Sequence, residues 1–280
     1  MTYSWKKGMS IDQQWESWQE HNPLDKIEAP DTETLKEAVV KDLSYVSAMD
    51  VKEYTLYQKW CEVHDKYPTQ EVNSFFDDKP TLKDPKQGAL LQEIKNNFWL
   101  PEDQEEYLYL EPELLWTDGD EVKSITGSEM PAIWNGMRTF LSTMKNNSNI
   151  GRNLNFLIRD KKTKKLLGVT CMSSDFLDLT PRDNYIGWER VAKTQRMINH
   201  TCIGSTIVPI QPLGYNLVGG KLLALLCLSR TVEDTWEHQY HDKLVGVTTT
   251  SLYGKTKEIP LSQYDRLKYW KKMGWTAGSV

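Results

Sequence analysis

A buried strand followed by a glycine loop and a leucine-rich helix constrains the fold of this chain more than any other feature. Residues 203–210 are β-branched and apolar, which favours a strand covered on both faces. Gly214, Gly219 and Gly220 follow, and a leucine-rich run reaches Leu228. A helix start exposes unpaired N–H groups and the positive end of the helix dipole, and glycine lets a ligand approach the backbone. The segment therefore predicts either a phosphate cradle or a close helix–sheet contact.

The elements around this segment predict an α/β fold with a mixed sheet. Residues 153–159 and 166–173 flank a charged turn and predict a hairpin. Pro131 begins a run with apolar residues at helical spacing, so we expect a helix over Met130–Lys145. We expect the remaining elements as follows: strands at 107–110, 113–116 and 244–251, helices at 188–201 and 263–272, and an irregular segment at 174–187. This order favours helices that cover the crossovers of a mixed sheet.

The first 105 residues predict an acidic, helical, tryptophan-rich extension, and residues 106–280 predict the α/β domain. Ser10 is a good N-cap for a helix that reaches Glu20, and Asp31 or Thr32 can cap a second helix through Val40. The tryptophans of this extension are packing anchors in one interpretation and base-stacking platforms in the other.

Charge is divided unevenly along the chain. Residues 1–149 contain 15 lysines and arginines against 28 aspartates and glutamates, whereas residues 150–280 contain 19 against 11. The first part therefore carries a charge of −13 and the second +8, which gives the net charge of −5. A basic half favours a polyanionic partner such as nucleic acid. The acidic half can dock on the basic half, dock on another protein or mimic nucleic acid, and two independently solvated surfaces of opposite sign remain the alternative.

Composition favours a soluble, cytoplasmic protein. No apolar run approaches the roughly 18 residues that a membrane span needs, and the N-terminus lacks the apolar core of a signal peptide. His238 and His241 form an H-x-x-H pair without an obvious third ligand, so we assign no metal site. The cysteines are expected to be reduced core thiols: Cys61, Cys171, Cys202 and Cys227.

The strand, loop and helix of residues 203–228 resemble the acyl-CoA site of GNAT acyltransferases. In that family the fourth strand runs into a Q/R-x-x-G-x-G/A loop, whose amides bind the pyrophosphate of acyl-CoA at a helix start. The loop here is longer than that motif. Lys221 places a positive charge in the first turn, where it opposes the helix dipole unless an anion binds there. The resemblance implies a site for acyl-CoA or another acyl donor at these residues: Gln211, Gly214, Asn216, Gly219, Gly220 and Lys221.

The end of the chain resembles the closing helix of the GNAT fold. In that family a tyrosine near this helix protonates the leaving thiolate, and a phenol is chemically suited to that role. Tyr264 and Tyr269 are the candidates, and Tyr264 is our choice for the catalytic acid. Both are packing residues in the alternative interpretation.

Several segments together resemble a narrower phage and bacterial family, related to the Druantia anti-phage protein A and akin to the Mom-type DNA-modifying acyltransferases. The segments are Lys165–Val169, Leu179–Trp188, Gly214–Leu223, Leu244–Gly254 and Gln263–Gly274. The resemblance covers about residues 115–280. It implies a nucleic-acid substrate, which the basic half of the chain favours independently.

Base chemistry requires an accessible amine and an extruded base. Arg182, Tyr185 and Trp188 are candidates for holding that base, with Asp183 as the general base. The alternative is that Pro181–Gly187 is a structural turn, because Asp and Asn favour turns.

A second polar group follows the strand at residues 244–251. Alternation along a strand places Thr249, Ser251 and Tyr253 on one face, where hydroxyl groups can line a cleft between splayed strands. We assign Ser251 to catalysis and Thr249 and Tyr253 to substrate binding. Cross-strand packing is the alternative.

Two functions remain open from the sequence. The first is a phage-type, GNAT-like acyltransferase that modifies nucleic acid in the manner of Mom. The second is a non-catalytic protein of the same fold that binds DNA or a protein complex, either as a virion component or as an anti-defence factor. The first places the protein in the cytoplasm, which is the host cytoplasm if a phage encodes it, and the second also allows a location in the virion. The chain is therefore only a candidate enzyme at this point.

Overall fold

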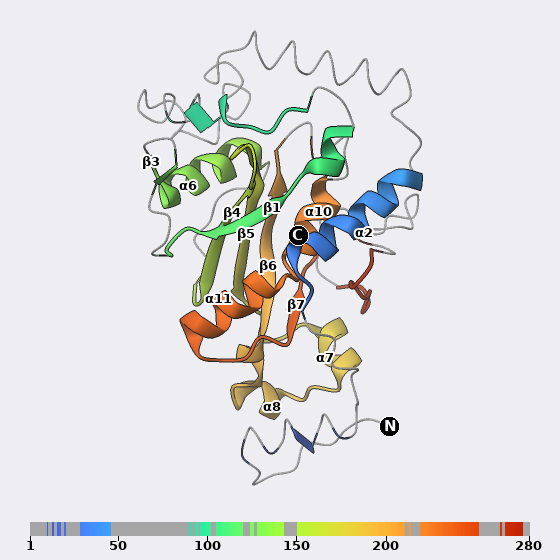
Figure 1. Cartoon of the computed structure of the whole chain (residues 1–280). Coiled ribbons are helices and arrows are strands. Elements are labelled where there is room, and N and C mark those ends of the chain that lie inside the picture. Colours follow the sequence, from blue (N-terminus) through green and yellow to red (C-terminus); the bar gives the residue numbers. More distant parts are fainter. Residues whose placement is uncertain are drawn as a thin grey trace.

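The computed structural model places a five-stranded mixed sheet at the centre of the molecule (Figure 1). It describes residues 29–45, 96–101, 105–119, 124–125, 128–142, 150–210, 219–251 and 267–276, with isolated positions 10, 13, 16, 17, 20, 90, 93, 94, 213 and 264. The sheet strands run in the spatial order β1 (Pro112–Trp116), β4 (Asn153–Asp160), β5 (Leu166–Ser174), β6 (Thr201–Pro209) and β7 (Gly246–Thr248).

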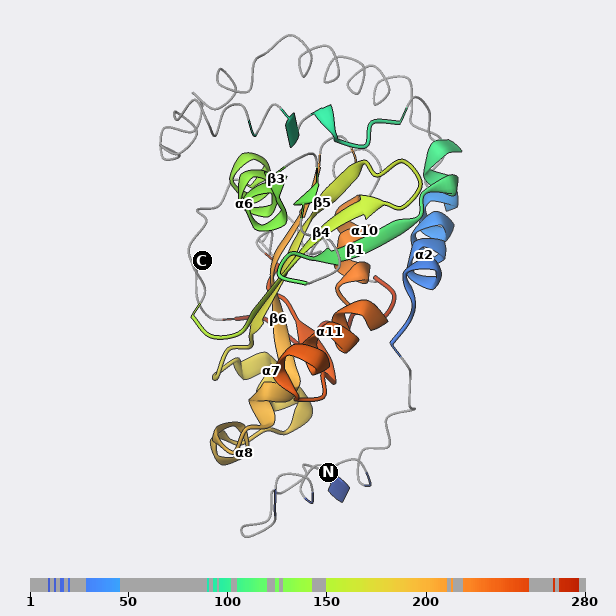
Figure 2. The ribbon, with the colours of Figure 1, turned by 60° about the vertical axis from the view of Figure 1, so that its left-hand side comes forward.

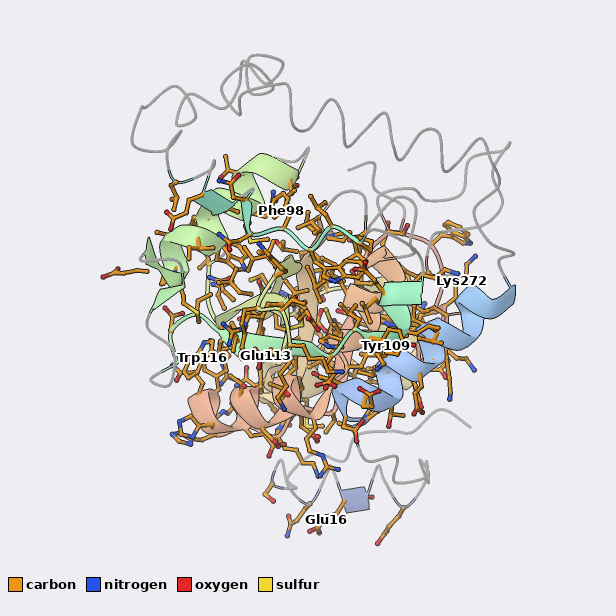
Figure 3. All side chains as sticks on the ribbon, turned by 45° about the horizontal axis from the view of Figure 1, so that its top comes forward. Glu16, Phe98, Tyr109, Glu113, Trp116 and Lys272 are labelled. Atoms are coloured by element: carbon orange, nitrogen blue, oxygen red, sulfur yellow. The ribbon has the colours of Figure 1, made fainter. Side chains whose placement is uncertain are left out.

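The β4–β5 hairpin is confirmed as the sequence predicts. Phe156 pairs with Thr170, and the pairing shifts by one residue near Arg159. β5 is buried along nearly its whole length because β4 and β6 flank it and helices lie on its faces. β1 pairs antiparallel with β4 and forms one edge of the sheet, where Glu113 and Trp116 lie (Figure 3).

The pairing of β6 with β7 is parallel, whereas every other pairing in this sheet is antiparallel among the described strands. The paired register runs from Thr201 and Gly246 to Ile203 and Thr248. β6 continues to Pro209, but β7 ends at Thr248. The two strands therefore part after Ile203, and a space opens beside the second half of β6.

Helices cover both faces of the sheet (Figure 2). α6 (Met130–Leu141) lies on one face and begins with Pro131 in its first turn, as expected. α10 (Gly219–Leu226) packs on the other face beside α2 (Thr32–Tyr45). Gly168 permits the close approach of α10, because a Cβ there would lie 2.5 Å from Leu223 Cδ2 and 2.6 Å from the Val208 oxygen. The strand–loop–helix prediction is therefore confirmed at its strand and its helix.

Part of the N-terminal region belongs to the same core as the sheet. Asp31 caps α2, since its Oδ1 accepts from the Thr34 N–H at 2.7 Å. Leu35 on α2 and Phe98 are buried in the main hydrophobic cluster, and Phe98 forms an isolated bridge with Leu166 (Figure 3). The boundary at residue 105 stays a prediction, but within the described part these residues do not form a core of their own.

Five further helices and a two-stranded sheet complete the described structure. The helices are η2 (Glu105–Tyr109), α7 (Thr180–Ile186), α8 (Arg190–Thr194), η3 (Met197–His200) and α11 (Arg230–Tyr240). The second sheet pairs β2 (Ser124–Ile125) with β3 (Ser128–Glu129). α7 and α8 lie together at one end of the sheet (Figures 1 and 2).

Three sequence expectations were wrong in this region. Residues 107–110 are not a strand, because Tyr107 and Tyr109 belong to η2. The irregular segment at 174–187 contains α7, and the helix expected over 188–201 is divided into α8 and η3. Arg196 has a left-handed backbone conformation with a φ of 75°, which ends α8 and redirects the chain.

The helix expected over 263–272 is also wrong where the structure describes it. Leu267 to Thr276 form a turn and irregular backbone, and Tyr269 has a φ of 67°. A left-handed residue at this position interrupts the i to i−4 hydrogen bonds that a helix needs. The Tyr264 and Trp270 rings stack with their centroids 5.9 Å apart, so the segment folds by aromatic packing instead.

Within the described ranges, no helix combines the length and the apolar character of a membrane span. The same residues hold no group of three or more His, Cys, Asp or Glu side chains placed to bind a metal ion. The three described cysteines, Cys171, Cys202 and Cys227, are buried free thiols, as expected.

Candidate functional site

A polar cavity of about 520 Å³ lies where β6 and β7 part. Its walls come from α6, from the end of β5, from the second half of β6 and from the chain just after β7. The Thr249 hydroxyl marks the point of divergence, because it donates to the Gly204 carbonyl one residue beyond the last paired residue of β6. Hydroxyl and guanidinium groups therefore share one hollow with apolar side chains such as Ile203, Ile207 and Phe176.

Arg138 brings a positive charge from α6 to the wall of the cavity. The residue is buried, and its Nε donates to Thr206 Oγ1 on β6 at 3.3 Å. Burial lowers the pKa of the guanidinium from its usual value. An arginine stays charged in proteins even so, and a buried cation attracts an oxyanion or a carbonyl oxygen strongly.

A hydroxyl network joins β4, β5 and β6 on the same wall. Ser173 donates to Asn153 Oδ1 at 2.9 Å, and its oxygen lies 2.7 Å from Ser205 Oγ. Cys171 Sγ lies 3.3 Å from the Ser173 oxygen. Because Ser173 and Ser205 both line the cavity, the network presents oriented hydroxyl groups there.

Asp175 closes the end of β5 and is held by two other elements. Its Oδ1 is 2.9 Å from Arg182 Nη1 on α7, and it accepts a hydrogen bond of 2.9 Å from the Thr248 hydroxyl on β7. Asp175 Oδ2 is buried and has no hydrogen-bond partner among the described residues. The Asp175 side chain is 0% exposed, so its carboxylate is fixed behind the cavity wall and does not face the cavity.

A buried ionic cluster lies behind Asp175. Arg182 Nε and Nη2 donate to Asp183 Oδ1 at 2.9 and 2.7 Å, and Lys193 Nζ donates to Asp183 Oδ2 at 2.7 Å. Burial alone lowers the pKa of Lys193, but the hydrogen bonds to Asp178 and Asp183 outweigh burial and raise it. The cluster fixes α7 and α8 against the end of the sheet.

The family model described as Druantia protein DruA matches residues 121–280, which is more than half of the chain and includes every cavity residue named above. The chain belongs to the Druantia protein DruA family. A DruA protein from Escherichia coli (strain UMEA 4076-1) is 31% identical over 143 residues, which cover 47% of this chain and 35% of that protein. The chain therefore matches about a third of the length of this DruA protein, and no solved structure matches it.

Two of the predicted site residues line the cavity of this DruA-family domain. Thr249 and Tyr264 are among its walls. Ser251 follows directly after the cavity residue Thr250, and its hydroxyl is buried without a hydrogen-bond partner among the described residues. The structure thus gathers three of the predicted polar residues near the divergence of β6 and β7, while their chemical roles stay predictions.

The predicted base-holding residues lie elsewhere. Arg182 and Asp183 are buried and paired in the ionic cluster, and the Trp188 ring lies under the Arg182 guanidinium at 5.3 Å. Tyr185 is exposed, but it lines a separate groove beside the C-terminal segment. The structure therefore does not bring Asp183 together with Tyr264 in the cavity.

Of the predicted donor-site residues, the structure describes Gly219, Gly220 and Lys221, at the start of α10. Gly219 is a packing glycine, because a Cβ there would lie 2.5 Å from Leu213 Cγ. A Cβ on Gly220 would meet nothing within 4 Å, and Lys221 follows it in the first turn of α10. Gln211, Gly214, Asn216 and Tyr253 lie outside the described residues.

The sequence alone did not identify four cavity residues: Arg138, Ser173, Asp175 and Ser205. Arg138 interrupts the apolar face of α6, and that was the available signal in the chain. Asp175 follows a long buried strand, but its partners Arg182 and Thr248 are far from one another in the sequence. This non-local pairing gives no local pattern to detect.

Proposed function

We propose that the chain transfers an acyl group from a thioester donor such as acyl-CoA to an amine on a nucleic-acid base, as part of an anti-phage defence function. The observation that carries the proposal is the polar cavity between the diverging parallel strands β6 and β7. A space between splayed parallel strands is also what the GNAT resemblance implies. The relation to Druantia supports the defence context.

The cavity offers a proton donor and a cation for the reaction. The amine nitrogen attacks the acyl carbon, so a C–N bond forms, the C–S bond breaks, the nitrogen loses a proton and the sulfur gains one. The Asp175 carboxylate is 0% exposed behind the cavity wall, so the nitrogen releases its proton to solvent water. Tyr264 lines the cavity from the C-terminal segment, and its phenol can donate the proton that the sulfur gains. Arg138 can stabilise the oxyanion that forms in between.

The start of α10 is the part of the chain best suited to hold the donor phosphates. Gly220 leaves open space at the first turn, and Lys221 supplies a positive charge there. The N–H groups of a helix start favour an anion in the same place. A nucleic-acid acceptor fits the charge of residues 150–280, where basic residues exceed acidic ones by eight.

Nucleoside mass spectrometry of DNA and RNA, incubated with the purified chain and acyl-CoA, tests this proposal. We expect a base heavier by one acyl group with the wild type. Tyr264→Phe should lower the rate by about 100-fold or more, the effect typical of losing a general acid. Tyr109→Phe, on the exposed surface of η2, is the matched control and should leave the rate unchanged. An unmodified base profile with the wild type would overturn the proposal.

A second function is favoured by a different observation. Both oxygens of Asp183 are bonded within the ionic cluster, and the Gly219 turn is packed against Leu213. Such packing also suits a non-catalytic member of the family that binds nucleic acid or a defence complex. Thermal unfolding with and without acyl-CoA separates the two functions, because a ligand that binds the folded state raises the melting temperature. A shift with acyl-CoA supports transfer, and a shift with DNA alone supports binding without catalysis.

A further inference from the structure

A second hollow lies outside the cavity, between α7 and the C-terminal segment. It measures about 380 Å³, within the range of small-ligand pockets of about 300–1,000 Å³. Pro181, Asn184 and Tyr185 form one wall, and Gly274 and Trp275 form part of the other. We call it the α7 groove. The proposed reaction makes no use of it.

The backbone brings these two walls into direct contact at the base of the groove. A Cβ on Gly274 would lie 3.1 Å from Pro181 Cβ, a tight contact, so a glycine favours the close approach of the C-terminal segment to α7. Gly274 also has a φ of 149°, a conformation that other residues rarely adopt. The groove is therefore built by a specific backbone arrangement.

Two aromatic side chains remain accessible at this groove. Tyr185 is 54% exposed and Trp275 is 45% exposed, whereas Trp188 and Trp236 are buried. Exposed aromatic faces of this size cost free energy in water unless a partner covers them. Rings on opposite walls of a groove suit a flat, stacking ligand.

One lysine lies over each of the two rings. Lys271 Nζ lies 5.6 Å from the centre of the Tyr185 ring, and Lys272 Nζ lies 4.1 Å from the centre of the Trp275 ring. Residues 267–276 contain three lysines and no acidic residue, and Lys272 lies at the surface of the molecule (Figure 3). Asp183, the acidic residue of α7, is buried and paired with Arg182 and Lys193. The groove therefore presents positive charge beside its stacking surfaces.

The groove and the cavity share one chain segment. Asp175, Phe176 and Leu177 line the cavity, while Thr180, Pro181, Asn184 and Tyr185 line the groove. The Arg182–Asp175 ion pair joins the two parts of this segment rigidly. A strand bound in the groove would therefore be held next to the cavity.

We propose that the α7 groove binds single-stranded nucleic acid, with unpaired bases stacked on Tyr185 and Trp275 and phosphates near Lys271 and Lys272. Stacking on aromatic rings within a basic groove is the general chemistry of single-strand recognition. A duplex does not offer its base faces, so the groove distinguishes unpaired bases from paired ones. This inference deepens the proposed function and rests on it for the acceptor, which it identifies as an unpaired strand.

Fluorescence anisotropy with labelled oligonucleotides of about 12 nucleotides, without any acyl donor, tests the groove. Tyr185→Leu and Trp275→Leu should each weaken single-strand binding by about 5-fold to 150-fold, the range for loss of one stacking platform. Tyr109→Leu removes a ring that is 67% exposed on η2, away from the groove, and is expected to bind like the wild type. Wild-type affinity in both groove variants, or equal affinity for a duplex, would overturn the proposal.

Salt dependence supplies a second measurement. Lys271→Gln and Lys272→Gln should each lower the slope of log affinity against log salt by about 0.7, since each removes one phosphate contact to a single strand. Lys161→Gln, in the exposed β4–β5 turn, is the matched control and should leave the slope unchanged. Unchanged slopes in both groove variants would contradict a phosphate path along this segment.

The two proposals fail in different ways. Groove-dependent binding of single strands without any modified base would refute the transferase and leave the groove standing. Base modification at an unchanged rate in Tyr185→Leu and Trp275→Leu would refute the groove and leave the transferase standing. Binding of a protein in place of any oligonucleotide, lost in the same variants, would also overturn the nucleic-acid assignment.

Discussion

Arg182 and Asp175 form an ion pair that is almost completely buried. The Nη1 and Oδ1 atoms are 2.9 Å apart, and the side chains are 2% and 0% exposed. The pair connects α7 to the end of β5, and through Asp183 it also engages Lys193 on α8. The segment that separates the cavity from the α7 groove is therefore fixed by charge as well as by packing.

Arg182→Met should lower the free energy of unfolding by about 3–5 kcal/mol, because it leaves Asp175 and Asp183 as buried carboxylates with fewer partners. Urea denaturation of the purified chain measures the change. Lys162→Met is the control, since Lys162 pairs with Glu111 on the surface, where a pair contributes little. Equal stabilities of the two variants would show that the buried cluster does not hold the fold together.

Gly168→Ala should destabilise the sheet by about 1–3 kcal/mol, the usual cost of overpacking a core. The new Cβ would meet the Val208 oxygen at 2.6 Å, and a backbone atom of a central strand cannot move aside easily. Gly220→Ala is the matched control because its Cβ would meet nothing within 4 Å. Thermal unfolding should show a lower melting temperature for the first variant only. A stable Gly168→Ala would contradict the close packing of β5, β6 and α10.

The elements that the sequence predicted well are those with a strong local pattern. The β4–β5 hairpin has apolar alternation and a charged turn, and β6 followed by α10 is β-branched and then leucine-rich. α11 was missed although Val232 and Trp236 are four residues apart and buried, because most of its other residues are polar. The segment after Tyr264 has helical spacing in the sequence, but the left-handed Tyr269 prevents a helix.

The site was harder to predict because its geometry is non-local. Thr249, Ser251 and Tyr264 were found from hydroxyl-rich segments and a resemblance, and the structure gathers them near the cavity. Asp183 was chosen as a base because its neighbours are polar, but only the fold shows that Arg182 and Lys193 occupy its oxygens. Burial and pairing between distant segments are not visible in a local pattern.

The buried thiols predict how stability depends on pH. Burial raises the pKa of Cys202 and of Cys227 above the ordinary value of 9.0. In the unfolded chain both thiols ionise near that ordinary value, whereas in the folded chain they stay protonated. Their contribution to stability is therefore complete below about pH 9 and is lost as the pH rises toward the folded-state pKa.

Urea denaturation from about pH 8 to about pH 10 measures this loss, which approaches about 1.4 kcal/mol per pH unit for each thiol above the unfolded pKa. The Cys202→Ala/Cys227→Ala double variant should show a flatter dependence over the same range. A double variant with the same slope as the wild type would assign the alkaline loss to other groups.

Filling the cavity should stop turnover without unfolding the chain. Ser205 lines the cavity and is exposed to it, so Ser205→Leu places an apolar side chain where substrate atoms must lie. We expect modified bases to fall below about 1% of the wild-type amount, since reacting atoms must approach to about 3–3.5 Å. Ser205→Ala is the matched control: it removes the hydrogen bond to Ser173 but leaves the space open, and should retain most of the activity. If Ser205→Leu modifies bases as fast as the wild type, the reaction does not take place in this cavity, whereas loss of activity in both variants would assign the effect to the hydroxyl network.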